Sequence, residues 1–206
     1  MLVQIPVDSF SLEGELILPQ GAVGLVLFVH GSGSSRLSPR NNFVAKILNQ
    51  AKLSTLLIDL LSEKEDLVYE TRFDIELLAE RLSLVIDWLL LNQETKHLPL
   101  GLFGASTGAA AALRAAAERE AVIKAIVSRG GRPDLAKESL GKVKAPTLLI
   151  VGDHDSDVMA LNEESLALLQ TTKELKIVPG ATHLFEEPGC LETVAELSKA
   201  WFLAHL

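Results

Sequence analysis

Short, unbroken apolar runs alternate with longer segments of helical periodicity along most of this chain, and this alternation is what most constrains the fold. Apolar runs without polar positions are typical of strands covered on both faces, as in a parallel sheet. Such strands are expected at 24–30, 55–60, 98–103, 123–128, 147–151 and 175–178, and helices at about 39–52, 74–92, 109–117, 158–169 and 191–203. The pattern predicts an α/β fold, a mostly parallel sheet with helices on both faces.

Two further apolar segments, 2–8 and 12–19, are joined at 9–11 and predict an antiparallel hairpin that opens the sheet. The sheet then has about eight strands. At 206 residues the chain is long enough to bury a large core, and no internal repeat or linker stands out. We therefore expect residues 1–206 to form a single domain, with a loop at 62–66.

The sequence Gly104-Ala-Ser-Thr-Gly108 lies between a predicted strand and an alanine-rich run of high helix propensity. A serine at so sharp a strand-to-helix turn has a strained backbone, and side chains in place of Gly104 and Gly108 would collide across it. The turn projects the hydroxyl of Ser106 beyond the sheet, at the positive end of the helix, where an acyl-transfer nucleophile belongs. The alternative is a glycine-rich helix start at which Ser106 and Thr107 only cap.

A serine hydroxyl is a poor nucleophile and needs a base to take its proton. His183 follows a strand near the C-terminus and is the candidate base; the alternative is an exposed loop histidine. His30 ends the strand before a Gly-Ser loop and is expected to brace that loop by a hydrogen bond. His97 precedes a strand at the wrong end of the sheet, and His154 and His205 are expected to be exposed.

The base needs a third group that holds its tautomer and stabilises its charge. The loop after the strand at 147–151 offers Asp153, Asp155 and Asp157. Asp155 is preferred, because three residues past the turn glycine its side chain can fold back toward His183. Asp157 is expected to cap the following helix.

The oxyanion of the reaction needs two hydrogen-bond donors. One is the backbone N–H of Thr107, and the other is expected from the loop after His30, from Ser32 with Gly33 as the alternate. The small side chains of that loop let a carbonyl oxygen approach the backbone. The alternative is a flexible, solvated loop.

Four motifs together resemble the α/β-hydrolase superfamily, closest to its compact dienelactone-hydrolase-like branch. They are His30-Gly-Ser-Gly33, Gly104-Ala-Ser-Thr-Gly108, Gly152-x-x-Asp155 and Gly180-x-x-His183, and the match runs from about residue 24 to the C-terminus. The resemblance implies an α/β-hydrolase fold with the triad Ser106, Asp155 and His183, in the chain order of that superfamily. The short 128–147 connection implies no cap domain.

This chain departs from the branch in one respect: dienelactone hydrolases proper use a cysteine nucleophile, whereas this turn carries Ser106. Cys190 is in no position to substitute for it. A single cysteine also excludes an internal disulfide and a cysteine-based metal cluster, and no metal or organic cofactor is implied.

The charge balance bears on partners and substrate. With 19 Lys and Arg against 27 Asp and Glu, the net charge of −8 favours neither a nucleic-acid nor an anionic-membrane surface. Arginine binds carboxylate or phosphate bidentately, so Arg36 and Arg129, in loops at the functional edge, are expected to select a small anionic substrate. The alternative is pairing with surface carboxylates such as Asp134.

The sequence thus predicts a serine hydrolase of carboxylic ester or lactone bonds, whose partner is a small molecule. Acyl transfer, thioester cleavage or perhydrolysis on the same triad, and a non-catalytic ligand-binding role, are the alternatives. No N-terminal signal pattern or membrane-length apolar run is present, which favours a cytoplasmic protein, although a signal peptide lost in cloning would look the same. Nothing indicates an oligomeric state.

Overall fold

The structure is a computed structural model, and it describes residues 1–7 and 10–206. An eight-stranded sheet runs through the molecule in the order β1-β2-β4-β3-β5-β6-β7-β8. The strands are β1 Leu2–Val7, β2 Phe10–Ile17, β3 Gly24–Val29, β4 Leu53–Ile58, β5 Leu100–Ala105, β6 Ile123–Arg129, β7 Thr147–Gly152 and β8 Lys173–Val178. Strands β1 and β2 pair antiparallel, and β2 pairs antiparallel with β4. From β4 to β8 every pairing is parallel, so the predicted fold class is confirmed.

The burial of the strands follows their sequence patterns. Every residue of β3, β4, β5 and β7 is buried, as the unbroken apolar runs predict. The edge strand β8 instead has polar residues that reach solvent, in the sequence Lys-Glu-Leu-Lys-Ile-Val. Charged side chains along an exposed edge oppose pairing with another sheet, so the polarity of β8 fits its place at the end of the strand order.

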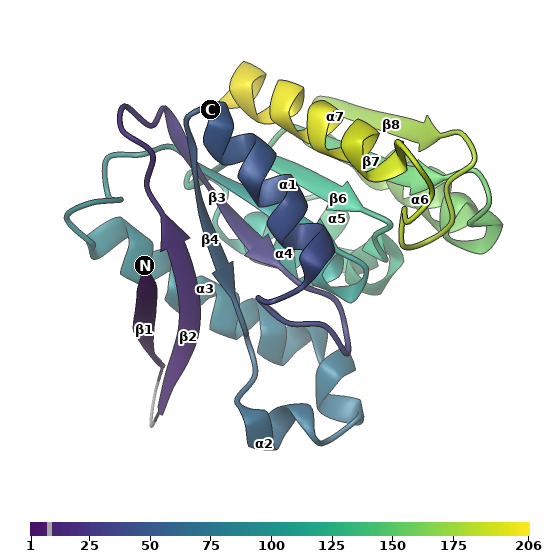
Figure 1. The fold of residues 1–206 in the computed structure, drawn as a ribbon. Helices are drawn as coiled ribbons and strands as arrows, with labels where there is room; N and C mark the ends of the chain where they lie inside the picture. The colour runs from purple at the N-terminus through teal and green to yellow at the C-terminus, as the bar shows by residue number, and fades with distance from the viewer. Residues whose placement is uncertain (8–9) are drawn as a thin grey trace.

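Helices cover both faces of the sheet (Figure 1). Their bounds are α1 Pro39–Gln50, α2 Glu63–Asp66, α3 Ile75–Leu91, α4 Thr107–Glu118, α5 Lys137–Leu140, α6 Ser156–Leu168 and α7 Cys190–His205, with 3₁₀ turns η1 Glu70–Phe73 and η2 Pro133–Ala136. Helices α1 and α7 pack together over one apolar cluster. Helices α3 and α4 pack together over another, on the opposite face.

Several element boundaries differ from the prediction. Strand β2 begins at Phe10, so that part of the expected 9–11 turn is strand, while residues 8 and 9 lie outside the described part. Helix α1 ends at Gln50 rather than 52, because Lys52 has a left-handed backbone (φ 62°) that no helix can continue. The segment 62–66, expected as a loop, contains α2.

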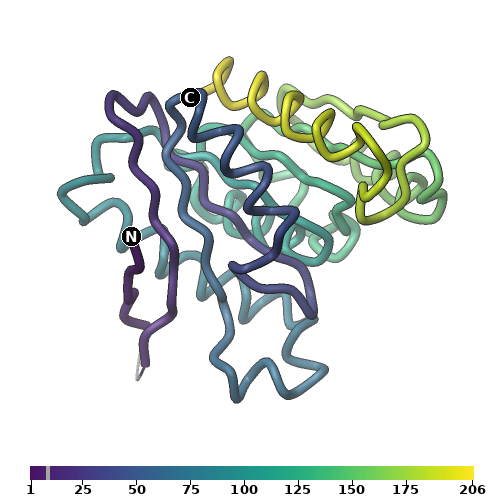
Figure 2. Tube along the Cα trace, viewed as in Figure 1, coloured from purple at the N-terminus to yellow at the C-terminus, as the bar shows by residue number. Residues whose placement is uncertain are grey.

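The fold brings the chemically interesting loops to one edge of the sheet. In a parallel sheet the carboxyl ends of the strands meet at one edge, so the loops after β3, β5, β6, β7 and β8 lie there. Figure 2 shows the path of the chain through these elements from the N-terminus to the C-terminus. The connection from β6 to β7 contains only the short elements η2 and α5, packed against α4. None of the described helices combines the length and hydropathy needed to cross a membrane.

Candidate active site

Ser106 stands at the turn between β5 and α4 in a strained conformation, with φ 50° and ψ −123°. Few non-glycine residues tolerate a positive φ, so the strain must be held by the packing around it. A Cβ on Gly108 would overlap the carbonyl oxygens of Val29 and His30, and one on Gly104 would overlap the backbone of α4. Gly104 therefore avoids the collision across the turn that the sequence predicts, and Gly108 lets the turn lie tightly against the end of β3, a contact that was not predicted.

His183 and Asp155 form a hydrogen-bonded pair. The Nδ1 atom of His183 lies 2.6 Å from a carboxylate oxygen of Asp155, which is the N-cap residue of α6 but makes no cap bond with its side chain. The expectation that Asp157 caps this helix is wrong, because α6 already starts at Ser156 and Asp157 lies in its first turn. With Nδ1 engaged, Nε2 of His183 is the nitrogen free to accept a proton.

The end of β6 and the loop after it contact both Ser106 and His183. The amide of Ser106 donates to the carbonyl of Arg129 (3.2 Å), and its carbonyl accepts from the amide of Arg132 (3.0 Å). Between these contacts lies Gly130, where an added Cβ would stand 3.5 Å from Cε1 of His183. Among the described contacts none joins the Ser106 hydroxyl to His183; such bonds are often long without substrate and tighten in the complex.

The two expected oxyanion donors also lie together. The backbone N–H of Ser32 donates to Oγ1 of Thr107 at 2.9 Å. The α-carbon of Gly31 packs directly on the nucleophile, since an added Cβ would lie 2.8 Å from Cβ of Ser106. The loop after β3 thus packs against the nucleophile turn. The hydroxyl of Thr107 accepts from the backbone N–H of Ser32, which is the N–H expected to donate to the oxyanion.

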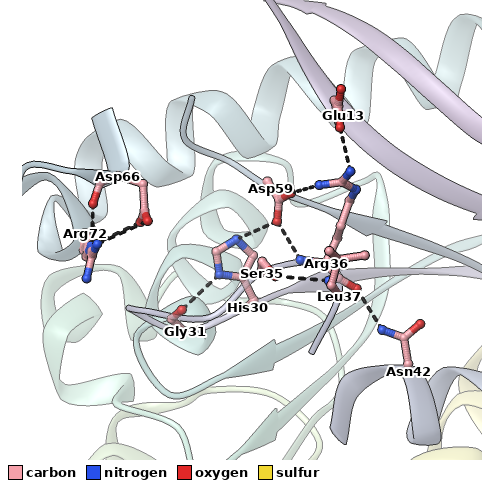
Figure 3. A network of polar contacts seen from close by, with 10 residues as sticks. All are labelled: Glu13, His30, Gly31, Ser35, Arg36, Leu37, Asn42, Asp59, Asp66 and Arg72. Carbon is pink, nitrogen blue, oxygen red and sulfur yellow. Dashed lines mark hydrogen bonds and ion pairs between the residues drawn. The ribbon is translucent and has the colours of Figure 1, made fainter. Parts of the chain in front are cut away.

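A polar network behind this loop fixes its first peptide (Figure 3). His30 Nδ1 lies 2.9 Å from the carbonyl oxygen of Gly31, so Nδ1 must carry the proton it donates. On the other side, Nε2 of His30 faces Asp59 at 3.5 Å. Asp59 accepts from both the backbone and the guanidinium of Arg36, which also reaches Glu13 at 2.6 Å. His30 braces the loop in the manner the sequence predicts.

The two arginines expected to bind substrate have different surroundings. Arg36 pairs through its two terminal nitrogens with Asp59 and Glu13, on the β2 side of the loop, while its buried Nε has no partner. Arg129, the last residue of β6, is buried under the N-terminal end of α1, where its Nη2 lies 3.4 Å from Oδ1 of Asn41. Arg132, in the loop after β6, pairs with Asp134, the kind of surface pairing that was the alternative for the arginines at this edge.

Sequence reasoning counted Arg72 among the arginines in loops at the functional edge but gave it no role, and it did not assign Asp59 to the site. A narrow pocket beside the nucleophile turn is lined by Ser32, Gly33, Arg72 and Thr107 among others. Arg72 is held by Asp66, and its Nη1 approaches Gly33, where an added Cβ would stand 3.9 Å away. Asp59 had a detectable signal, since it directly follows a buried strand at its carboxyl end.

In the part of the chain that the structure describes, no group of three or more His, Cys, Asp or Glu side chains is placed to hold a metal ion. Cys190 is buried, and its Sγ donates to the carbonyl of Pro179 at 3.8 Å. His154 is largely exposed, and Asp153 accepts from the amide of Gly180, a structural contact between two loops.

Comparison with known proteins shows the family of this chain. Residues 62–201 match the model of the dienelactone hydrolase family. The chain belongs to this family. The dienelactone hydrolase of Anabaena variabilis ATCC 29413 has a solved structure with 56% identity and a TM-score of 0.98, over 100% of this chain and 97% of that one. Membership supports a hydrolase activity.

More distant structures share the fold alone. Est1E from Butyrivibrio proteoclasticus, solved also with ferulic acid bound, superposes with a TM-score of 0.85 at 18% identity, over 98% of each chain.

Two curated Mycobacterium tuberculosis proteins, from strains CDC 1551 and H37Rv, are 53% identical over 204 residues and are named provisionally as phosphoribosyl transferases. The chain spans about half the length of these relatives, matching 99% of its own residues to 46% of theirs.

Proposed function

We propose that this chain is a serine hydrolase of carboxylic ester or lactone bonds that works through an acyl-enzyme. The observation that carries the proposal is the 2.6 Å pair of His183 and Asp155, at the same sheet edge as the strained Ser106. A strained serine, an oriented imidazole and a nearby pair of backbone donors are the parts that acyl transfer requires.

In the proposed reaction, Oγ of Ser106 attacks the carbonyl carbon while its proton passes to Nε2 of His183. The carboxylate of Asp155 stabilises the resulting imidazolium. The carbonyl oxygen becomes an oxyanion, which replaces the hydroxyl of Thr107 on the N–H of Ser32 and also accepts from the N–H of Thr107.

The intermediate then collapses. The bond to the alcohol oxygen breaks, and that oxygen takes the proton from His183, which leaves an acyl ester on Ser106. A water molecule gives its proton to His183 and attacks this ester, and the acid leaves as Ser106 regains its proton. In a lactone the alcohol and the acid are two ends of one product.

Covalent labelling tests the proposal. A fluorophosphonate probe is expected to label the wild-type chain at Ser106, and Ser106→Ala to abolish labelling and lower ester hydrolysis by about 10⁴-fold or more. Ser128→Ala, at a buried serine of β6, is the control for loss of a hydroxyl elsewhere. Labelling that survives Ser106→Ala, or hydrolysis that does, would contradict the assignment.

The same triad would serve acyl transfer, thioester cleavage or perhydrolysis, so product analysis with added alcohol, thiol or peroxide acceptors separates these reactions from hydrolysis. A chain that takes no label yet binds esters would instead be a ligand-binding protein.

We also propose a cytoplasmic protein with a small-molecule substrate; one buried cysteine and a net charge of −8 support this.

A further inference from the structure

Arg129 is a buried cation without an acidic partner among the described residues. The side chain is only 7% exposed, and its one hydrogen bond is the long contact from Nη2 to Asn41. Its Nε and Nη1 are buried with no partner at all. Burial, together with the neighbouring charge of Arg40, lowers the pKa of Arg129 to about 10. Unmade hydrogen bonds of a buried charge cost stability, so this arrangement needs an explanation.

Two further positive groups face the same place. Arg40, in the first turn of α1, has a buried Nε that also lacks a partner. The first turn of this twelve-residue helix contains no acidic residue. Pro39 has no N–H and Ser38 caps the amide of Asn41, so the backbone N–H of Arg40 is the one that the described contacts leave for a ligand. Backbone N–H groups at a helix N-terminus and guanidinium groups are the two commonest ligands of carboxylate and phosphate.

Packing against Phe185 does not account for the cation. The guanidinium carbon of Arg129 lies 6.0 Å from the centre of the Phe185 ring, at the outer limit of a cation–π contact. Such a contact uses the face of the guanidinium and leaves its in-plane N–H groups without acceptors. An oxyanion in the plane of the guanidinium would supply the missing acceptors.

The position of Arg129 relates this place to catalysis. Its carbonyl accepts the amide of Ser106, and the next residue, Gly130, packs on the ring of His183. The end of β6 therefore contacts the nucleophile and the base through its backbone, and the side chain of Arg129 runs from there to Asn41 in the first turn of α1. A substrate with a charged group close to its ester could reach both places at once.

We propose that Arg129, Arg40 and the N-terminus of α1 form a subsite for a carboxylate or phosphate group of the substrate. Glu186, three residues beyond His183, already places a carboxylate at this cluster, since it pairs with Arg40 at 2.7 Å. The Glu186 side chain is 61% exposed, and exposed ion pairs are weak, so a ligand anion can exchange with it at little cost. This inference rests on the proposed ester hydrolysis and names the class of substrate.

The test fills the subsite from within instead of removing the buried arginine, whose loss could unfold the chain. Asn41→Asp places a carboxylate 3.4 Å or so from Arg129, at the atom that now accepts its bond. Gln50→Glu is the matched control, because it adds the same charge to the exposed far end of α1. The readout is the ratio of kcat/KM for mono-4-nitrophenyl succinate to that for 4-nitrophenyl butyrate, with inhibition by inorganic phosphate as a second arm.

The expected result is a wild-type preference for the anionic ester or inhibition by phosphate, reduced about ten- to a hundredfold by Asn41→Asp and unchanged by Gln50→Glu. The ester arm identifies a carboxylate site and the phosphate arm a phosphate site. Asn41→Asp is also expected to raise Tm, because it supplies the missing anion. Equal effects of the two variants, a lowered Tm, or no response in either arm would overturn the subsite. Fluorophosphonate labelling of wild type separates these outcomes from failure of the proposed hydrolysis.

Discussion

His30 fixes the direction of a single peptide. In a trans peptide the C=O and the following N–H point opposite ways, so the bond from His30 to the carbonyl of Gly31 also aims the N–H of Ser32. That N–H points toward Thr107, where the oxyanion is proposed to bind. We infer that His30 is a positioning residue of the oxyanion hole.

Two amide substitutions of His30 are expected to differ in kcat. His30→Asn keeps a donor near the place of Nδ1 and so can still hold the carbonyl of Gly31, whereas His30→Gln places its amide near Nε2, toward Asp59. Since one oxyanion donor contributes about 10²–10³-fold, loosening it is expected to lower kcat about tenfold in His30→Gln, with a smaller loss in His30→Asn and little change in KM. Steady-state kinetics on one neutral ester measures the difference. Equal losses in both variants would refute the role.

At the scale of single residues, local motifs were predictable and distant partners were not. Ser106, Asp155 and His183 each follow a strand within a few residues of a turn glycine, and this spacing is visible in the sequence. The partners of Arg36 are not visible in the sequence. Glu13 and Asp59 each lie 23 residues away along the chain and contact Arg36 only because β2 pairs with β4. An arginine beside the functional edge therefore does not reveal whether it faces substrate.

The short helix α2 shows a different limit, at the scale of elements. Ser62 and Glu65 form a reciprocal capping box, so the S-x-x-E signal of a helix start was present in a segment expected to be a loop. The segment is polar and brief, and contacts with later elements hold it: Glu65 pairs with Arg81 of α3 at 2.8 Å, and Asp66 pairs with Arg72 of η1 at 3.1 Å. Tertiary contacts decide such marginal helices, and hydrophobic periodicity does not report them.

Loss of the Glu65 charge is expected to destabilise the chain near neutral pH. Burial raises the pKa of the Glu65 carboxyl, but hydrogen bonds from Ser62 and Arg81 outweigh it and leave that pKa lowered. A lowered pKa stabilises the fold above the unfolded-state value, and this contribution is lost as pH falls through the folded-state value. Glu65→Gln is expected to cost roughly 1–2 kcal/mol, or about 2–8 °C in Tm, at pH 7.

Thermal unfolding at pH 7 and at pH 3 measures this effect, and the gap between Glu65→Gln and wild type is expected to narrow at the lower pH. Glu63→Gln is the control, because Glu63 lies exposed in the same turn and takes no part in the capping box. Equal shifts for the two variants, or a gap that widens in acid, would contradict the contribution of the Glu65 contacts.

For the whole molecule, the class of fold followed from the alternation of strands and helices, while the order of the strands did not. Unbroken apolar runs indicate that β3, β4, β5 and β7 are central strands. They do not indicate that β4 lies between β2 and β3. That order arises from packing between segments far apart in the chain, such as α1 against α7 and the last residue, Leu206, against Gly24 of β3. Sequence periodicity is a property of neighbouring residues and does not predict contacts between distant segments.

The length of the Mycobacterium tuberculosis relatives leads to a prediction about the whole chain. The dienelactone hydrolase fold accounts for this chain from end to end, whereas the chain corresponds to 46% of the proteins named as phosphoribosyl transferases. We expect the activity in that name to reside in the remainder of those proteins. Incubated with phosphoribosyl diphosphate and a nucleobase, this chain is expected to release no diphosphate while it hydrolyses 4-nitrophenyl esters in a parallel reaction. If diphosphate release persists in Ser106→Ala, this chain itself would carry a transferase site that is separate from the proposed triad.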